Sequence, residues 1–261
     1  MLKNTIINFK SKILYIFRYV IKPIFYLHHF VPVKLDYKWE DSNSDRIVIL
    51  NKIADKIKAK RYLEIGCDLN QVFNKINCEN KVGVDPSRGG TIKDTSDNFF
   101  KTNKEKFDLI FIDGLHTYDQ ILKDFMNSFD CLNDGGYIVM HDLIPRTWLE
   151  EHIPRISNNW SGDVWKISFL LKDIKGHDFK LLLTDFGLGV FSKKNNTITI
   201  NTFFPENLNF KYFVNNYKSL PIIDRDQFLE KTNSNGVMTR PIWILMNKLP
   251  MFKNAQCDAL K

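Results

Sequence analysis

The chain has 261 residues, of which 44% are hydrophobic and 26% charged, and its formal net charge is +7. This composition is ordinary for a folded protein and supplies enough apolar residues for a sizeable core. The charge is uneven, because residues 1–35 carry +6 without one acidic residue and the rest of the chain carries only +1. Nucleic-acid binding needs a basic face on the folded body, so no nucleic-acid partner is expected.

The four cysteines form neither a CxxC pair nor a metal-ligand spacing. They are Cys67, Cys78, Cys131 and Cys257. A disulfide framework is not expected in a chain of this length, and the pattern favours reduced thiols and a cytoplasmic location.

Residues 1–36 are predicted to form a basic, apolar and helical N-terminal segment. Arg18 and Lys22 interrupt its apolar character, and the uninterrupted run 23–33 is too short to span a bilayer. No small-residue cleavage site follows, so a signal peptide is not expected. Two alternatives stay open: the segment lies on an anionic membrane surface as a peripheral contact, or it packs on the domain or on a partner subunit of a homo-oligomer.

Apolar periodicity then predicts alternating helices and strands. Helices are expected over 45–59, around 71–76, from Ser96 or Asp97, after Thr117 and over 164–171. Strands are expected over 61–66, 81–85, near 92, and over 107–113, 137–140, 179–183 and 187–191. Thr117 and Gln120 have capping-box spacing, and Asp134-Gly135 is typical of a turn.

This alternation predicts an α/β fold with a doubly wound, mostly parallel, seven-stranded Rossmann-like sheet. The expected organisation is an N-terminal segment over 1–36, a domain over 37–200 and a helical extension over 201–261.

Ligand-capable residues stand where the first two strands end. Glu64 and Gly66 close the first strand, and Asp85 closes the second. Glycine allows a ligand close to the backbone, and an acid at the second strand can accept the hydroxyl protons of a ribose. Because a phosphate-binding G-x-G-x-x-G is missing, an adenosine without phosphates fits better than a dinucleotide, and a dehydrogenase is disfavoured.

Two later strands end in acids and histidines. The stretch Phe107–Tyr118 places Asp113 and His116 after a buried strand, and Gly135–Asp142 ends in His141 and Asp142. The carboxyl ends of parallel strands meet at one edge of a sheet, so these side chains are expected to converge. Either histidine could take a proton from a substrate hydroxyl, since imidazole titrates near working pH.

Taken together, these motifs resemble the class I S-adenosylmethionine-dependent methyltransferases. The residues that carry the resemblance are Tyr62-Leu-Glu-Ile-Gly66, Val82-Gly-Val-Asp-Pro86, Thr95-Ser-Asp-Asn-Phe-Phe100, Phe107–Tyr118, Gly135–Asp142 and Ser161-Gly-Asp-Val-Trp-Lys166. They lie in consistent order over about residues 45–193, and they resemble most the bacterial branch with F-I-D-G-x-H-x-Y and G-G-x-x-x-x-H-D. That branch is often associated with methylation of sugars, polysaccharides and related natural products.

The resemblance implies a site. Glu64 and Gly66 would line the methionine end of S-adenosylmethionine, Asp85 would hold the ribose, and Ser96 or Asp97 would lie beside the adenine, with Asp113 also facing the cofactor. Asp113, His141 and Asp142 match the positions at which metal-dependent relatives hold a divalent cation such as Mg²⁺. Asp113, His116 and His141 are the expected catalytic residues.

The expected function is an O-methyltransferase that acts on a hydroxyl of a sugar or of a polysaccharide or glycan precursor. The alternative is a catalytically degenerate methyltransferase fold that serves as a binding module at a membrane surface or in an assembly. Methylation of nucleic-acid bases is disfavoured, because Asp113-Gly114-Leu115-His116 stands where such enzymes carry Asn/Asp-Pro-Pro-aromatic. Residues 143–162 and 201–261 are expected to contact the acceptor.

Overall fold

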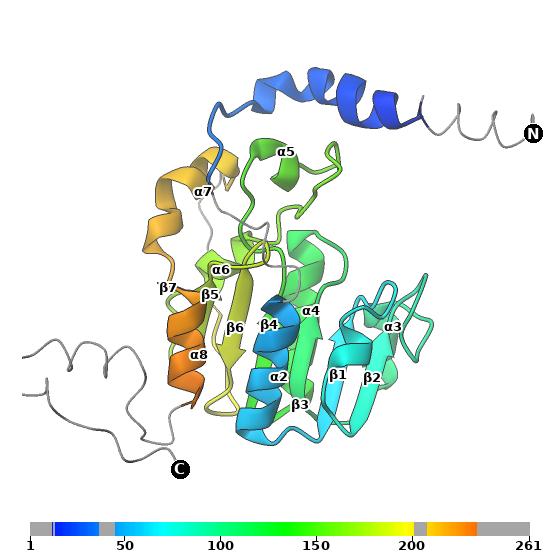
Figure 1. The fold of residues 1–261 in the computed structure, drawn as a ribbon, viewed down its shortest axis with the longest axis vertical. Coiled ribbons are helices and arrows are strands. Elements are labelled where there is room, and N and C mark those ends of the chain that lie inside the picture. Colours follow the sequence, from blue (N-terminus) through cyan, green and yellow to red (C-terminus); the bar gives the residue numbers. More distant parts are fainter. Residues whose placement is uncertain (1–11, 13, 37–44, 201–207, 234–261) are drawn as a thin grey trace, which may run out of the picture.

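The computed structural model describes residues 12, 14–36, 45–200 and 208–233. Their centre is a seven-stranded sheet in the order β2-β1-β3-β4-β6-β5-β7 (Figure 1). Its strands are β1 Arg61–Ile65, β2 Asn80–Val84, β3 Phe107–Ile112, β4 Leu132–Met140, β5 Asp178–Leu182, β6 Leu188–Ser192 and β7 Ile222–Ile223. All neighbouring pairs are parallel except those of β6, which runs antiparallel to β4 and β5. The predicted α/β class and doubly wound, mostly parallel sheet are confirmed.

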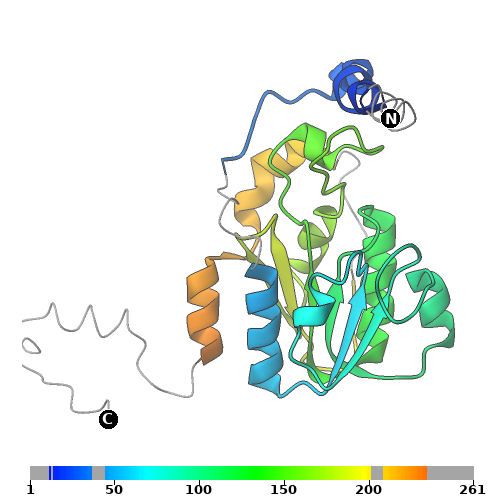
Figure 2. The same ribbon diagram turned by 45° about the vertical axis from the view of Figure 1, so that its right-hand side comes forward.

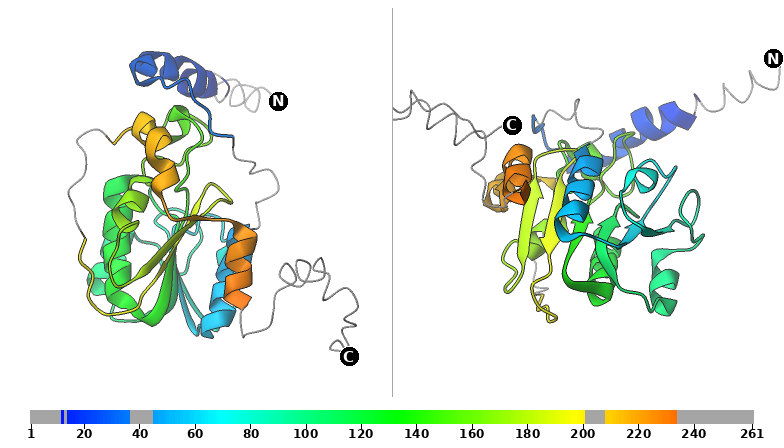
Figure 3. Two further views of the ribbon diagram at one scale, coloured as in Figure 1. Left: turned by 90° about the vertical axis from the view of Figure 1, so that its left-hand side faces the viewer. Right: turned by 60° about the horizontal axis from the view of Figure 1, so that its bottom comes forward.

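Helices cover both faces of the sheet. Helices α2 (Asp45–Ile57) and α8 (Arg225–Asn233) lie side by side on one face (Figure 3). Helices α3 (Ser96–Thr102), α4 (Tyr118–Cys131) and α6 (Lys166–Leu171) lie on the other. The short helices α5 (Trp148–Glu151) and α7 (Phe210–Asn216) lie beyond the carboxyl ends of the parallel strands (Figure 1).

Strand β3 shows why the sheet is covered twice. Successive side chains of a strand point to opposite faces. Leu109 and Phe111 pack in the cluster that includes α2, while Ile110 and Ile112 pack in the cluster that includes α4, and all four are buried. A strand buried on both faces is apolar throughout, which is why Phe107–Ile112 lacks polar alternation.

Two sequence expectations fail locally. No α-helix forms around 71–76; only the 3₁₀ turn Phe73–Lys75 forms, because Asn51 of α2 donates to Lys75 O and accepts from Asn77 N and so ends the turn. Asp134-Gly135 is not a separate turn either. It belongs to β4, whose register against β3 shifts there, and Gly135 takes the positive φ of 74° that the bulge requires.

The expected C-terminal extension adds to the sheet. Strand β7 pairs with β5, and Phe210 and Phe213 of α7 are buried in the core. Residues 201–207 and 234–261 lie outside the described part of the chain. The three-part division into 1–36, 37–200 and 201–261 stays a prediction.

Over residues 14–29, the N-terminal segment is helical and crosses over the end of the domain (Figures 1 and 2). It continues as a π-helix over Phe17–Ile21 and a 3₁₀ helix over Lys22–His29. His29 Nδ1 lies 2.9 Å from His152 Nε2, and Leu35 N donates to Arg146 O, which ties the segment to the domain. Among the described residues, no helix combines the length and the apolar character that a membrane crossing needs.

Candidate active site

A cavity of about 530 Å³ opens where β1, β2 and β3 end. This is the edge at which open α/β sheets bind ligands. Of the expected cofactor residues, the cavity is lined by Gly66, Asp85, Ser96, Asp97 and Asp113. Glu64 does not line it.

Gly66 brings the loop after β1 against the end of β3. Its φ is +87°, and a Cβ at this position would overlap the carbonyl oxygen of Asp113. The position therefore requires glycine both for its backbone conformation and for the close approach. This packing places two strand ends side by side at the cavity floor.

The rest of that loop turns without further glycines. Asp68 and Asn70 take φ values of 44° and 61°, a conformation that Asn and Asp tolerate better than most residues. The Asn70 side chain accepts a hydrogen bond of 2.6 Å from Gly90 N, which ties the loop to the one after β2. The single glycine is therefore enough to build this turn.

Asp85 organises the loop after β2. Its carboxylate accepts hydrogen bonds from the backbone N–H groups of Ser87, Arg88 and Asp68 at 2.7 to 2.9 Å. Burial alone would raise the pKa of Asp85, but these hydrogen bonds outweigh it and the pKa is lowered. An ionised carboxylate has about four acceptor positions, so it can still accept from a ligand in the cavity.

The cavity wall at α3 is held by Gln120 of α4. Its amide nitrogen lies 3.2 Å from Ser96 Oγ, 3.0 Å from Asp97 Oδ1 and 3.1 Å from Asp124 Oδ1. The expected capping box is absent, because this amide points to α3 and the Thr117 side chain makes no cap hydrogen bond. Asp163 replaces it by accepting from Tyr118 N at 2.6 Å.

Glu64 is buried behind the cavity. Its carboxyl accepts a 2.5 Å hydrogen bond from the Tyr62 hydroxyl, and its exposed fraction is 1%. Burial raises the pKa of Glu64 to about 8. The side chain is therefore largely protonated at neutral pH.

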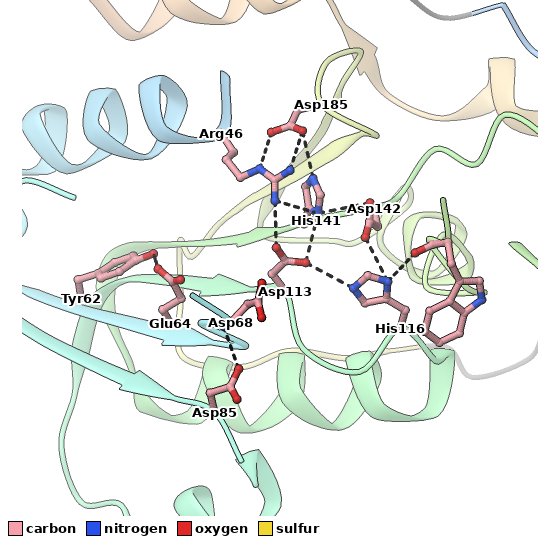
Figure 4. A network of polar contacts seen from close by, with 11 residues as sticks. Arg46, Tyr62, Glu64, Asp68, Asp85, Asp113, His116, His141, Asp142 and Asp185 are labelled. Atoms are coloured by element: carbon pink, nitrogen blue, oxygen red, sulfur yellow. Dashed lines mark hydrogen bonds and ion pairs between the residues drawn. The ribbon is translucent and has the colours of Figure 1, made fainter. Parts of the chain in front are cut away.

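Beyond the cavity, the expected acid and histidine residues meet in one polar cluster (Figure 4). His141 Nδ1 lies 3.2 Å from Asp113 Oδ1 and 3.3 Å from Asp142 Oδ1. Asp142 takes a left-handed φ of 65°, which turns its carboxylate toward both histidines. Asp113 belongs to both regions, since it also lines the cavity.

His116 closes the cluster on the side away from β1. Its Nδ1 lies 2.9 Å from the carbonyl oxygen of Trp160 and 3.2 Å from Asp142 Oδ2, and its ring stacks on the Trp160 ring. A proton on Nδ1 satisfies both acceptors. The other nitrogen, Nε2, lies 3.5 Å from Asp113 Oδ1.

The carboxylates of the cluster set its electrostatics. Burial would lower the pKa of His116, but Asp142 and Asp113 outweigh it and raise the pKa to about 9. The same two carboxylates raise the pKa of the more deeply buried His141 against its own burial. Burial would likewise raise the pKa of Asp113, yet His141, His116 and Arg46 lower it.

Two charged members of the cluster were not expected from the sequence. Arg46 comes from the first turn of α2 and Asp185 from the loop between β5 and β6, and the two form a pair with distances of 2.5 and 2.8 Å. Neither belongs to a motif, and an arginine at a helix start or an aspartate in a hairpin is common. No sequence pattern pointed to Trp160 either, although its carbonyl oxygen and its ring contact His116.

The expected metal residues do come together. One ligand atom each from Asp113, His141 and Asp142 lies within 4.8 Å of the others, a spacing that could surround one ion. In this arrangement, however, Arg46 Nη1 already donates to Asp113 Oδ2 at 3.0 Å and lies 3.5 Å from His141 Nδ1. A guanidinium therefore occupies one side of the set.

Comparisons with known proteins agree with this placement. Residues 63–143, which contain β1 to β4 and the site, match a family model described as a methyltransferase domain. A curated relative, an uncharacterised protein of Acanthamoeba polyphaga mimivirus, is 36% identical over 50 residues; the match spans 19% of this chain and only 23% of that protein.

Solved structures show distant likenesses. A putative caffeoyl-CoA O-methyltransferase from Staphylococcus aureus is 14% identical, with 62% of this chain and 86% of that chain covered at a TM-score of 0.44. A Podospora anserina methyltransferase bound to SAH is 19% identical, with 57% and 78% covered at a TM-score of 0.43.

The family match includes Gly66, Asp85, Asp113, His116 and His141. Residues 63–143 are thus similar to a methyltransferase domain, in line with the expected S-adenosylmethionine-dependent methyltransferase.

Proposed function

We propose that the protein is an S-adenosylmethionine-dependent O-methyltransferase that methylates a hydroxyl of a sugar or glycan precursor. The observation that carries this proposal is the shared position of Asp113. It lines the cavity at the ends of β1 to β3 and belongs to the cluster that holds His116 and His141. A methyl donor and a proton acceptor would thus be held side by side, and such positioning supplies much of the rate in methyl transfer.

Different residues of the cavity would hold different parts of the cofactor. Asp85 would accept from the ribose hydroxyls with its remaining acceptor capacity, and Ser96 and Asp97 would lie beside the adenine. Gly66 keeps the floor free of side chains, and Glu64 supports that floor from behind. S-adenosylmethionine, when bound, supplies an electrophilic methyl group.

His116 is the better placed of the two histidines to take the proton of the acceptor hydroxyl. About 23% of its side chain is exposed against 5% for His141, and Trp160 O holds the Nδ1 proton so that the neutral ring presents Nε2. Asp113 and Asp142 raise the pKa of His116 to about 9, so the neutral ring that can accept the proton becomes more abundant as the pH rises toward 9, and methyl transfer should be faster there. His141 would orient Asp113 through the contact of its Nδ1 with Asp113 Oδ1.

A sugar hydroxyl as acceptor is favoured by the F-I-D-G-x-H-x-Y and G-G-x-x-x-x-H-D motifs at Phe111–Tyr118 and Gly135–Asp142. The acceptor side of the cluster is bordered by Trp160, within the 143–162 segment. The divalent cation expected at Asp113, His141 and Asp142 is not part of this proposal, because Arg46 already contacts Asp113 and His141 there.

The test is transfer of a labelled methyl group from S-adenosylmethionine to a panel of oligosaccharides and polysaccharide extracts. We expect label on a hydroxyl of at least one glycan, and loss of about 10²-fold or more in rate for His116→Ala. His28→Ala is the matched control, since His28 is exposed and lies outside the cluster. Cofactor binding without transfer to any acceptor would instead favour the degenerate binding module.

We further propose that the N-terminal helix contacts an anionic membrane surface. Many of its apolar side chains are exposed, including Phe17 at 54%, Ile24 at 59% and Phe25 at 69%. Neighbouring apolar side chains that stay exposed on a folded protein mark a surface that something else covers. Residues 1–35 carry lysines and an arginine but no acid, so a surface of anionic lipid complements them better than a second copy of the same basic segment.

A further inference from the structure

Arg46 extends into the polar cluster from the opposite face of the sheet to α4 (Figure 4). Nε donates to Asp185 Oδ2 at 2.5 Å, Nη2 to Asp185 Oδ1 at 2.8 Å, and Nη1 to Asp113 Oδ2 at 3.0 Å. The two-bond pair with Asp185 fixes the plane of the guanidinium and aims Nη1 at Asp113.

The position of Arg46 at the start of α2 is electrostatically unfavourable within the helix itself. A cation in the first turn of a helix faces the positive end of the helix dipole. Two acids outside the helix, Asp185 and Asp113, compensate for this charge, and Asp185 is only 1% exposed. Arg46 therefore links α2 to the two loops that carry Asp185 and Asp113, and it is not an isolated surface ion pair.

The same guanidinium stands where a metal ion would need room. It uses Oδ2 of Asp113 and lies 3.5 Å from His141 Nδ1, which are two of the three groups spaced for an ion. His141 Nδ1 also lies within 3.3 Å of oxygens of both Asp113 and Asp142, so it acts as a donor there and not as a lone-pair ligand. As arranged, these residues do not fit a divalent cation.

We propose that Arg46 is the resident cation of this site and takes the place that a divalent metal ion would hold at Asp113, His141 and Asp142. An arginine stays protonated at every working pH, so its positive charge always balances the negative charge of the Asp113 carboxylate. The role of Asp113 beside the acceptor rests on the proposed function, and the role of Arg46 is added to it. Arg46 is then a positioning residue, tethered by Asp185.

The experiment is electron paramagnetic resonance of Mn²⁺ mixed with the full-length protein at equal concentration. With the wild type present, the signal of free Mn²⁺ is expected to keep the intensity that it has in buffer alone. In the double variant Arg46→Met, Asp185→Asn, which removes both the cation and the acid that would be left unpaired, Mn²⁺ should bind at least about tenfold more tightly. Arg61→Met is the matched control, since it removes the same charge from the opposite end of β1, and should bind no better than the wild type.

Two outcomes would overturn the inference. The first is stoichiometric Mn²⁺ binding by the wild type that Asp113→Asn abolishes. The second is a double variant that keeps the wild-type circular dichroism spectrum but gains no Mn²⁺ affinity. Calorimetry with S-adenosylmethionine on the same samples separates the two proposals, because failure to bind the cofactor would refute the proposed function without altering the Mn²⁺ result.

Discussion

Single residues at this site owe their properties to burial and to the carboxylates around them. Asp113 is the clearest example, because one side chain lines the cavity, pairs with Arg46 and contacts both histidines. Its position at the cavity was predictable from its place after a buried strand. Its partnership with Arg46 and Asp185 was not, since no local pattern links positions that lie far apart in the chain.

Glu64 gives a prediction for stability against pH. Its pKa in the folded protein is about 8, above the ordinary 4.5, so the folded state prefers the protonated form. Its contribution is therefore fully present below about pH 4.5 and is lost as pH rises through about 8. Glu64→Gln keeps the acceptor for Tyr62 and has no charge to bury, so it should match the wild type at about pH 5 and exceed it at about pH 9, by up to a few kcal/mol.

Urea unfolding of the two proteins at both pH values measures this difference. Glu79→Gln serves as the control, because Glu79 is exposed and should give no pH-dependent gain. A Glu64→Gln variant whose advantage is the same at both pH values would show that Glu64 is ionised in the fold.

At the scale of elements, the start of α4 depends on a residue that is distant in sequence. Asp163 accepts from Tyr118 N at 2.6 Å and pairs with Lys166 at 2.7 Å, so it caps α4 beside the loop that holds His116. Asp163→Ala should lower the free energy of unfolding by about 1–2 kcal/mol, because it leaves a helix-end N–H without its acceptor. Asp163→Asn, which keeps an acceptor oxygen, should lose less.

Chemical denaturation of these variants tests the cap, with the exposed Asp173→Ala as the reference for loss of an acid. Equal stability of Asp163→Ala and Asp173→Ala would mean that α4 starts without help from Asp163.

Helix α4 illustrates which structural features local sequence patterns predict and which they miss. The apolar spacing correctly predicted α4, and continuous apolar runs predicted β1, β3 and the β5–β6 pair, because burial imposes those patterns directly. The cap was predicted from Thr117 and Gln120 by local spacing, yet Gln120 binds Ser96 and Asp97 across the cavity. A local rule fails where a tertiary partner offers a better hydrogen bond.

At the scale of the whole molecule, the described part of the N-terminal helix lies over the end of the domain (Figure 2), and many of its apolar side chains are exposed. If it contacts anionic membranes, replacing two of its exposed aromatics in Phe17→Ser, Phe25→Ser should remove most of the binding, because apolar burial supplies the affinity that weak charge attraction cannot. The wild type should float with vesicles that contain phosphatidylserine and not with phosphatidylcholine alone.

Leu69→Ser is the matched control, since Leu69 is 58% exposed but lies in the loop after β1. Flotation of the Phe17→Ser, Phe25→Ser variant at the wild-type level would rule out this helix as the contact. A change in oligomeric state without a change in flotation would favour a second copy as the partner.

The proposed function requires that the cavity between the ends of β1, β2 and β3 bind S-adenosylmethionine. Calorimetric titration measures this binding, with Ser96→Trp to fill the cavity and Lys101→Trp to place the same side chain on an exposed position of α3. We expect one bound cofactor for the wild type and for Lys101→Trp, and none for Ser96→Trp. No binding to the wild type, or undiminished binding to a folded Ser96→Trp variant, would contradict it.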